Sequence, residues 1–203
     1  ICHTEAAKQV QHTKHWTWES LDPKTGQVRG KKNIINNYCT AVVSNEKDCM
    51  ACHAGYGWKD STFDFKVEKN VDCLICHDAT GTYRKLPGDA GHPVYKRTEF
   101  PPGSGKFVEP IDLKKVAQTV GKPSRSNCGS CHFFGGGANG AKHGDLDSSL
   151  QHPGKYLDVH MHEKGLNFTC ATCHSTSSHE ISGSRYNVAA AVKGPAQIRG
   201  AKT

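Results

Sequence analysis

Four copies of one short pattern, C-x-x-C-H, recur in the 203-residue chain. They read CMACH (49–53), CLICH (73–77), CGSCH (128–132) and CATCH (170–174). Two thiols three positions apart, on a tight turn or short helix, can each form a thioether with a vinyl group of the same haem. The histidine that follows then lies below the porphyrin and binds the iron as its proximal ligand. The pattern therefore predicts four covalently attached c-type haems.

The predicted attachment residues are Cys49, Cys52, Cys73, Cys76, Cys128, Cys131, Cys170 and Cys173, and the predicted proximal ligands are His53, His77, His132 and His174. Zinc bound by C-x-x-C pairs is the main rival interpretation. Zinc ribbons use such pairs two at a time and do not require a histidine after each pair, whereas here all four pairs carry one. A disulfide scaffold is less compatible still, because C-x-x-C pairs would close very small loops.

Nine further histidines are candidates for the distal side of the irons. They are His3, His12, His15, His92, His143, His152, His160, His162 and His179. Methionine, the other common ligand, occurs only twice in the chain, so we expect most irons to be bound by two histidines. Such haems are low-spin, with low reduction potentials suited to electron transfer. The favoured distal ligands are His12 or His15, His143, His160 and His179.

The composition is unusually polar for a chain of this length. Only 35% of the residues are hydrophobic, and 21 are glycine. Large flat macrocycles would supply the buried apolar surface that the side chains lack. Each ferric haem also carries two propionates against one net positive iron centre, so four oxidised haems lower the formal charge of +7 to about +3. Nucleic acid is therefore not an expected partner.

Regular structure is expected to be sparse. The three predicted helices cover residues 4–16, 111–121 and 187–194. Thr4 and Asp112 are the expected N-caps of the first two helices. His12 and His15, which are three positions apart, would share one face of the first helix.

Gly- and Pro-rich loops such as FPPGSGK separate these helices, and no strand pattern is convincing. No stretch has the composition of a linker between domains. We therefore expect a single multihaem cytochrome c domain over residues 1–203. Its chain would be mostly irregular, with short α-helices wrapped around closely packed haems.

Stretches outside the cysteine pattern carry a resemblance to a known family. They read HWTW (15–18), INNYC (35–39), CHAGYGWKD (52–60), VDCLICHDATGTY (71–83), CGSCHFFGGGANGAKHGDLDSSL (128–150), LDVHM (157–161) and NFTCATCH (167–174). In these stretches, which run through nearly all of the chain, the sequence resembles the N-terminal part of the octahaem tetrathionate reductase family. The resemblance implies a periplasmic protein of irregular to helical fold that carries c-type haems.

The resemblance also implies roles for individual residues. Cys2 and His3 match the second cysteine and the proximal ligand of the family's N-terminal motif. The motif CMACH then matches the second haem, the catalytic one, which in the family has a lysine on the iron and an Asn and a Cys in its pocket. Asn36 and Cys39 match that pocket pair. Lys142 matches the iron-binding lysine, and the adjacent His143 would serve another haem.

The family's eight haems need eight motifs, and this sequence holds four complete ones and a partial one at Cys2. We expect either the N-terminal part of a longer enzyme or a shorter relative. In the first case Cys2 holds a fifth haem, and Cys39 is a free thiol near the second haem. In the second case Cys2 pairs with Cys39 in a disulfide, and His3 ligates a haem of its own chain or of a neighbour.

Two functions are compatible with these features. The first is an electron-transfer protein whose four or five haems form a chain that can continue from subunit to subunit. The second is a reductase of small sulfur or nitrogen oxyanions, with substrate at the haem of residues 49–53 and with Lys142, Asn36 and Cys39 as catalytic residues. Electron transfer is favoured, because it is required in both cases, and enzymatic activity is left open.

The expected partners are redox proteins and further copies of the chain. No stretch of the sequence approaches the length of a transmembrane helix. Haem is attached to exported apoprotein outside the cytoplasm. We therefore expect a periplasmic or extracellular protein that is made with a cleaved signal.

Overall fold

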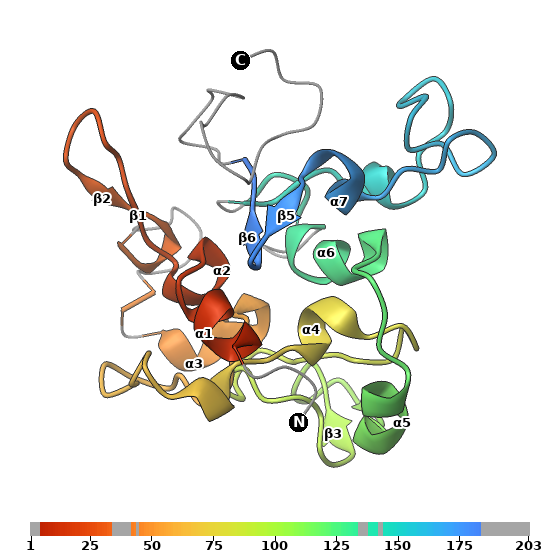
Figure 1. The fold of residues 1–203 in the computed structure, drawn as a ribbon. Helices are drawn as coiled ribbons and strands as arrows, with labels where there is room; N and C mark the ends of the chain where they lie inside the picture. Colours follow the sequence, from red (N-terminus) through yellow and green to blue (C-terminus); the bar gives the residue numbers. More distant parts are fainter. Residues whose placement is uncertain (1–4, 34–41, 44, 134–137, 142–143, 184–203) are drawn as a thin grey trace.

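The computed structural model describes residues 5–33, 42–43, 45–133, 138–141 and 144–183 of the chain (Figure 1). Its elements are all short. In chain order they are α1 (Ala6–Gln11), α2 (Lys14–Thr17), β1 (Ser20–Leu21), β2 (Val28–Arg29), η1 (Lys31–Asn33), α3 (Glu46–Cys49), η2 (Met50–Cys52), η3 (Glu68–Asn70), α4 (Leu74–His77), β3 (Thr98–Glu99), β4 (Phe107–Val108), α5 (Leu113–Gln118), α6 (Arg125–His132), η4 (Ser148–Gln151), α7 (Cys170–Cys173), β5 (Thr176–Ser177) and β6 (Glu180–Ile181). The predicted fold class, mostly irregular with short helices, is confirmed.

Sheet structure is confined to three antiparallel hairpins in the described part of the chain, where the sequence pattern had indicated none. The pairs are β1 with β2, β3 with β4, and β5 with β6. Each strand has two residues, which is too short for the alternation of apolar and polar residues that predicts a strand.

The predicted N-terminal helix is two helices, so the expectation of one continuous helix over 4–16 is wrong. Helix α1 ends at Gln11, and α2 begins at Lys14. Thr13 between them is extended, with φ −85° and ψ 158°. His12 and His15 therefore do not share one helix face. The expected cap at Thr4 lies outside the described residues.

The second predicted helix is confirmed as α5. The carboxylate of Asp112 accepts a hydrogen bond from the backbone N–H of Lys115 at 2.9 Å, as expected of an N-cap. The third predicted helix, over 187–194, lies outside the described residues. In the described part of the chain, no helix is long and apolar enough to cross a membrane.

The buried apolar side chains form two small clusters. One contains Trp18, Val42, Met50 and Trp58, and the other contains Ala54, Ile75, Tyr83 and Val116. Partly buried cysteines pack against both: Cys49 and Cys52 against the first, Cys76 and Cys131 against the second. The cores thus lie directly against the segments that carry the first three C-x-x-C-H motifs.

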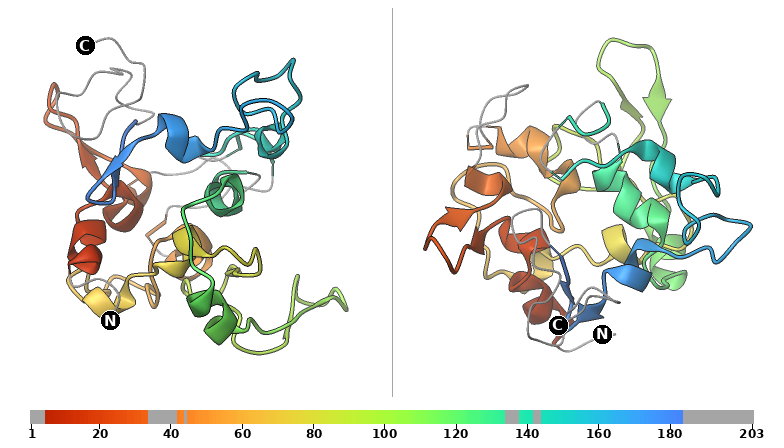
Figure 2. Two further views of the ribbon diagram at one scale, coloured as in Figure 1. Left: turned by 45° about the vertical axis from the view of Figure 1, so that its right-hand side comes forward. Right: turned by 90° about the horizontal axis from the view of Figure 1, so that it is seen from above.

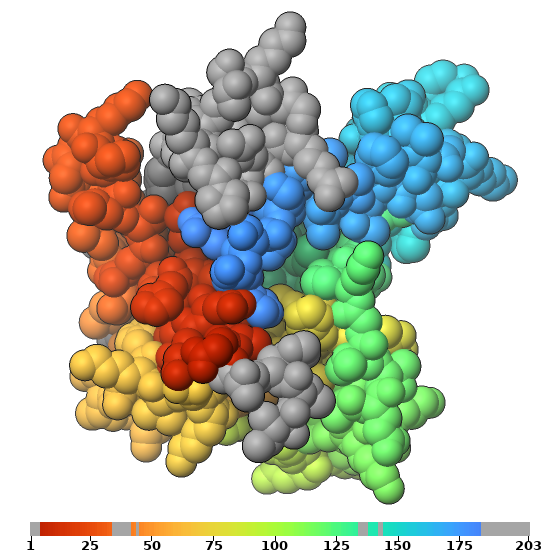
Figure 3. Space-filling model, in the orientation of Figure 1, coloured from red at the N-terminus to blue at the C-terminus, as the bar shows by residue number. Residues whose placement is uncertain are grey.

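Helix α6 occupies a central position. It lies between α4 and α7 in Figure 1 and in the left view of Figure 2, and it contacts α4 and η2. Its first residue, Arg125, donates hydrogen bonds to the Met161 carbonyl at 2.7 Å and to the Asn167 side chain. These bonds hold the base of the segment around 150–169, which forms a lobe at one corner of the molecule (Figure 3).

Candidate haem-binding site

The paired cysteines lie on single helical turns, as their spacing predicts. Helices α6 and α7 carry the third and fourth pairs, α4 with its N-cap Cys73 carries the second, and α3 with η2 carries the first. On a helical turn, residues three apart point to the same side. Each pair is thereby prepared to bind two neighbouring groups of one ligand.

Local side chains fix where three of these turns begin. Asp72 accepts hydrogen bonds from the N–H groups of Leu74 and Ile75, at 3.1 and 3.2 Å, before α4. Capping boxes at Ser124 and Thr169 begin α6 and α7. Each cap satisfies N–H groups that a free helix end leaves unpaired.

Three of the four motif histidines are held in the same way. The Nδ1 of His77 donates to the Gly121 carbonyl at 2.8 Å. The Nδ1 of His132 donates to the Gly144 carbonyl at 2.7 Å, and that of His174 to the Ser182 carbonyl at 2.9 Å. A hydrogen bond at Nδ1 fixes the tautomer and leaves the lone pair of Nε2 for a metal. These rings are therefore oriented as iron ligands require.

Two of these histidines face a second histidine. The ring centroids of His132 and His15 are 6.2 Å apart, and those of His77 and His179 are 6.4 Å apart. With metal–nitrogen bonds of about 2.0–2.1 Å, two imidazoles on opposite sides of one metal have centroids separated by roughly 6.3 Å. Both separations match that value. The two pairs thus fit haem iron bound by two histidines.

The surroundings of His15 favour a neutral ring. Burial, the charge of His132 and the charge of Lys14, in that order, lower the pKa of His15 to about 4. A metal-binding imidazole must be neutral, so His15 is prepared to act as a ligand at neutral pH. His12 and His15 are both exposed by accessible surface, but only the ring of His15 faces that of a motif histidine in the described chain, whereas His12 lines a cavity beside α1. The structure therefore favours His15 of the two alternatives.

His53, the histidine of the first motif, is placed differently. Its ring is fully buried among Trp16, Trp18, Trp58, Phe63 and Phe65, with centroids 5.0–6.3 Å away. Its Nε2–H donates to the Trp16 carbonyl at 2.7 Å, and within the described chain its buried Nδ1 has no hydrogen-bond partner. Burial lowers the pKa of His53 to about 3. The Nδ1 of His53 therefore carries the lone pair that could bind a metal. In the other three motifs Nδ1 is hydrogen-bonded and Nε2 carries that lone pair.

The remaining histidines are not paired with a motif histidine in the described residues. The side chain of His160, a predicted distal ligand, is 63% exposed and lies 3.6 Å from Asp158. His152 contacts Glu163 at 2.5 Å, and His92 stacks on Tyr56. The assignment of His160 stays a prediction.

The structure brings cysteines of different motifs together. Cys52 and Cys131 are each other's largest influence on the thiol pKa, and so are Cys128 and Cys170, which places these cysteines of different motifs side by side. Asn127 of α6 also donates to the Asp78 carbonyl, just after α4, at 3.0 Å. The third motif therefore contacts each of the other three. In the described chain, no cluster of three or more His, Cys, Asp or Glu is arranged to hold a metal ion.

A buried ion pair links the first and second motifs. Lys85 and Asp72 are 2.9 Å apart, and their side chains are 1% and 0% exposed. Lys85 also donates to the carbonyls of His53 and Gly55, at 2.7 and 3.0 Å. The hydroxyls of Tyr56 and Tyr83 each donate to Asp72 at 2.9 Å, and burial together with the Asp72 charge raises the pKa of both tyrosines.

The sequence analysis did not predict this network, because a charged pair in a polar chain produces no periodic pattern that would reveal it. Several predicted residues lie outside the described part of the chain. They are Cys2, His3, Asn36, Cys39, Lys142 and His143.

Comparisons with known proteins agree with this geometry. A family model described as cytochrome c554 and c-prime matches residues 1–78. A crystal structure of octaheme cytochrome c from Shewanella oneidensis is similar in fold, with a TM-score of 0.75 and 54% sequence identity over 90% of this chain. With the four motifs and the two histidine pairs, these matches identify the chain as a multihaem c-type cytochrome.

The chain spans 38% of the length of that octaheme cytochrome. It is also 25% identical, over 220 residues, to an uncharacterized protein of Archaeoglobus fulgidus, a match that covers 89% of this chain and 72% of the relative. The sequence-based recognition as a multihaem cytochrome is confirmed.

Proposed function

We propose that the chain is an electron-transfer protein that holds four haems, attached through its four cysteine pairs, in one domain. The observation that carries the proposal is the pairing of His132 with His15 and of His77 with His179 at 6.2 and 6.4 Å. Two histidines on one iron leave no position open for a substrate. Bound haem would supply reversible one-electron chemistry.

The protein's own contribution is to orient these ligands. Backbone carbonyls hold the Nδ1 atoms of His77, His132 and His174, so the rings need little reorganisation. The contacts between motifs keep the attachment points close together. Redox proteins are the proposed partners, and export to the periplasm or cell exterior is the proposed location, because haem is attached there.

Covalent haem is expected at four per chain. The thioethers would survive denaturation, so the intact mass under denaturing conditions should correspond to four haems, and acid–acetone extraction should remove none. A variant in which Cys73 and Cys76 are both serine is the matched control and should retain three. Extractable haem, or zinc in its place, would contradict the proposal. A haem-modified peptide containing Cys2 would instead raise the count to five.

The oxidised protein is expected to give mostly low-spin ferric signals in electron paramagnetic resonance, because two imidazoles produce a strong ligand field. A spectrum dominated by high-spin ferric iron would contradict electron transfer as the main role.

A second candidate function is the reduction of small sulfur or nitrogen oxyanions at the first motif. The observation that favours it is the different setting of His53, which makes this motif unlike the other three. Reduced protein should then be reoxidised by tetrathionate or nitrite over many turnovers, and Lys142→Ala should abolish this turnover. If neither oxyanion reoxidises the protein, the reductase function is rejected and electron transfer is the one function proposed.

A further inference from the structure

His179 lies at the tip of a tight hairpin. Strands β5 and β6 pair Ser177 with Glu180, and Ser178 and His179 form the two-residue turn between them. Both turn residues have left-handed backbone, with φ of 47° and 64°, as a type I′ turn requires. Asn and Gly usually occupy such turns, and histidine is among the other residue types that adopt a positive φ most often. The turn places the imidazole ring at the tip of the hairpin, beside α1.

Gln9 of α1 contacts that ring. The Nδ1–H of His179 donates to Gln9 Oε1 at 2.8 Å, between residues 170 positions apart in the sequence. Because the amide oxygen can only accept, the proton is on Nδ1 and the lone pair is on Nε2. This is the tautomer that an iron ligand needs, and the ring of His77 lies 6.4 Å away.

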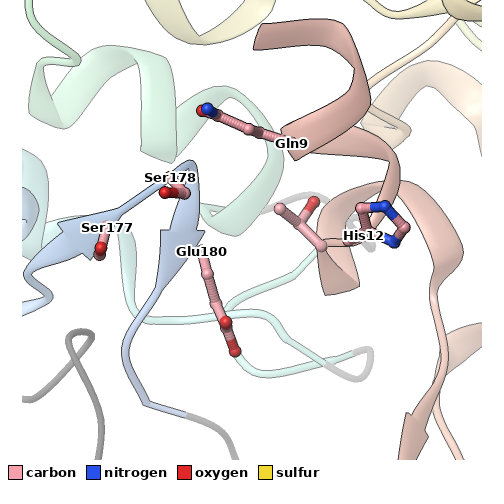
Figure 4. A pocket seen from close by; sticks show the side chains of 6 residues that line it. Gln9, His12, Ser177, Ser178 and Glu180 are labelled. Carbon is pink, nitrogen blue, oxygen red and sulfur yellow. The ribbon is translucent and has the colours of Figure 1, made fainter. Parts of the chain in front are cut away.

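A cavity separates part of the hairpin from α1. The cavity has a volume of about 230 Å³ and is lined by Gln9, His12, Thr13, Ser177, Ser178 and Glu180. Figure 4 shows Gln9 extending from α1 toward the tip of the hairpin, across this space. The amide therefore spans a gap that packing does not fill.

We propose that Gln9 is a positioning residue, which holds His179 as the distal ligand opposite His77 on the haem of Cys73 and Cys76. The inference rests on the proposed function. The three oriented motif histidines are held by backbone carbonyls, which substitution cannot remove. The Nδ1 of His179 is bonded to a side chain instead, so this hydrogen bond can be removed by one substitution.

The test measures how carbon monoxide binds to the fully reduced, haem-loaded protein. His179→Ala should leave one haem per chain five-coordinate and open to carbon monoxide. Gln9→Leu should keep the haem count but let carbon monoxide displace His179 from that haem about 10–100-fold faster than in the wild type. Gln9→Glu retains an acceptor and should restore slow binding, while lowering the reduction potential of that haem. Gln9→Asn is one methylene shorter and should also lose the hydrogen bond to His179, so it replaces Gln9→Leu if that variant does not accumulate.

The matched control is Gln11→Leu on the same helix, because Gln11 Nε2 is buried without a hydrogen-bond partner in the described chain. It should bind carbon monoxide as slowly as the wild type. The proposal is overturned if Gln9→Leu and Gln9→Asn also bind slowly while His179→Ala opens one haem, or if Gln11→Leu is accelerated equally. If His179→Ala opens no haem, the ligand pairing in the proposed function is wrong, and the inference fails with it.

Discussion

Replacing Lys85 by methionine is expected to lower the free energy of unfolding by about 3–5 kcal/mol. Lys85 and Asp72 form an ion pair whose side chains are 1% and 0% exposed. The substitution would leave the Asp72 carboxylate buried without a counter-charge, and the hydroxyls of Tyr56 and Tyr83 cannot replace one. It would also remove the donor to the His53 and Gly55 carbonyls. The first and second motifs would lose one of the links between them, alongside the backbone bond from Asp72 N–H to the Ala54 carbonyl.

Guanidinium unfolding followed by far-ultraviolet circular dichroism measures this loss. The matched control is Lys8→Met, which breaks the exposed pair with Glu5, where the side chains are 52% and 61% exposed. That change should cost less than about 1 kcal/mol. Adding Asp72→Asn to Lys85→Met should recover part of the loss, because no buried charge remains. Equal small losses for Lys85→Met and Lys8→Met would show that the buried pair is not a structural link.

Replacing His15 by methionine is expected to raise the reduction potential of one haem by roughly 0.1–0.3 V, within the span of about 0.8 V that axial ligands control. His15 faces His132 of the third motif, and methionine in place of histidine stabilises ferrous iron. At about 59 mV per tenfold for one electron, a rise of 0.2 V holds the electron there roughly 10³-fold more strongly. Because the third motif contacts each of the others, electrons from the other haems would accumulate on the haem of the third motif.

A spectroelectrochemical titration of both forms would resolve the shifted haem. His12→Met is the matched control, since it tests the other histidine that the sequence proposed for this role. It should leave all potentials within experimental error of the wild type. A shift in His12→Met and none in His15→Met would reverse the ligand assignment.

The local parts of the site could be predicted from the sequence. The spacing in C-x-x-C-H dictates a helical turn with both thiols on one side, and the structure has that turn in each motif. Asp112 was predictable as a cap because capping depends on residues only three positions apart. The break between α1 and α2 was not, since Thr13 is compatible with either a helix or an extended link.

The partners of the histidines could not be derived from the sequence. Nothing in the residues near His179 indicates that Gln9 would hold its ring, and nothing near Lys85 indicates that it would pair with Asp72. Such contacts depend on the path of the whole chain. The surplus of histidines predicted that ligand pairs exist, and only the fold distinguishes His15 from His12.

The two histidine pairs have a consequence for how the polypeptide folds. Each joins residues that are more than 100 positions apart, His15 with His132 and His77 with His179. A shared iron would act as a cross-link that closes a long loop, and closing a loop of about 100 residues restricts the unfolded chain by about 4.7 kcal/mol in the chain-entropy model. Two such cross-links would together approach the whole stability of an ordinary domain. The amount of folded protein in a cell would then follow the supply of haem more closely than the supply of polypeptide.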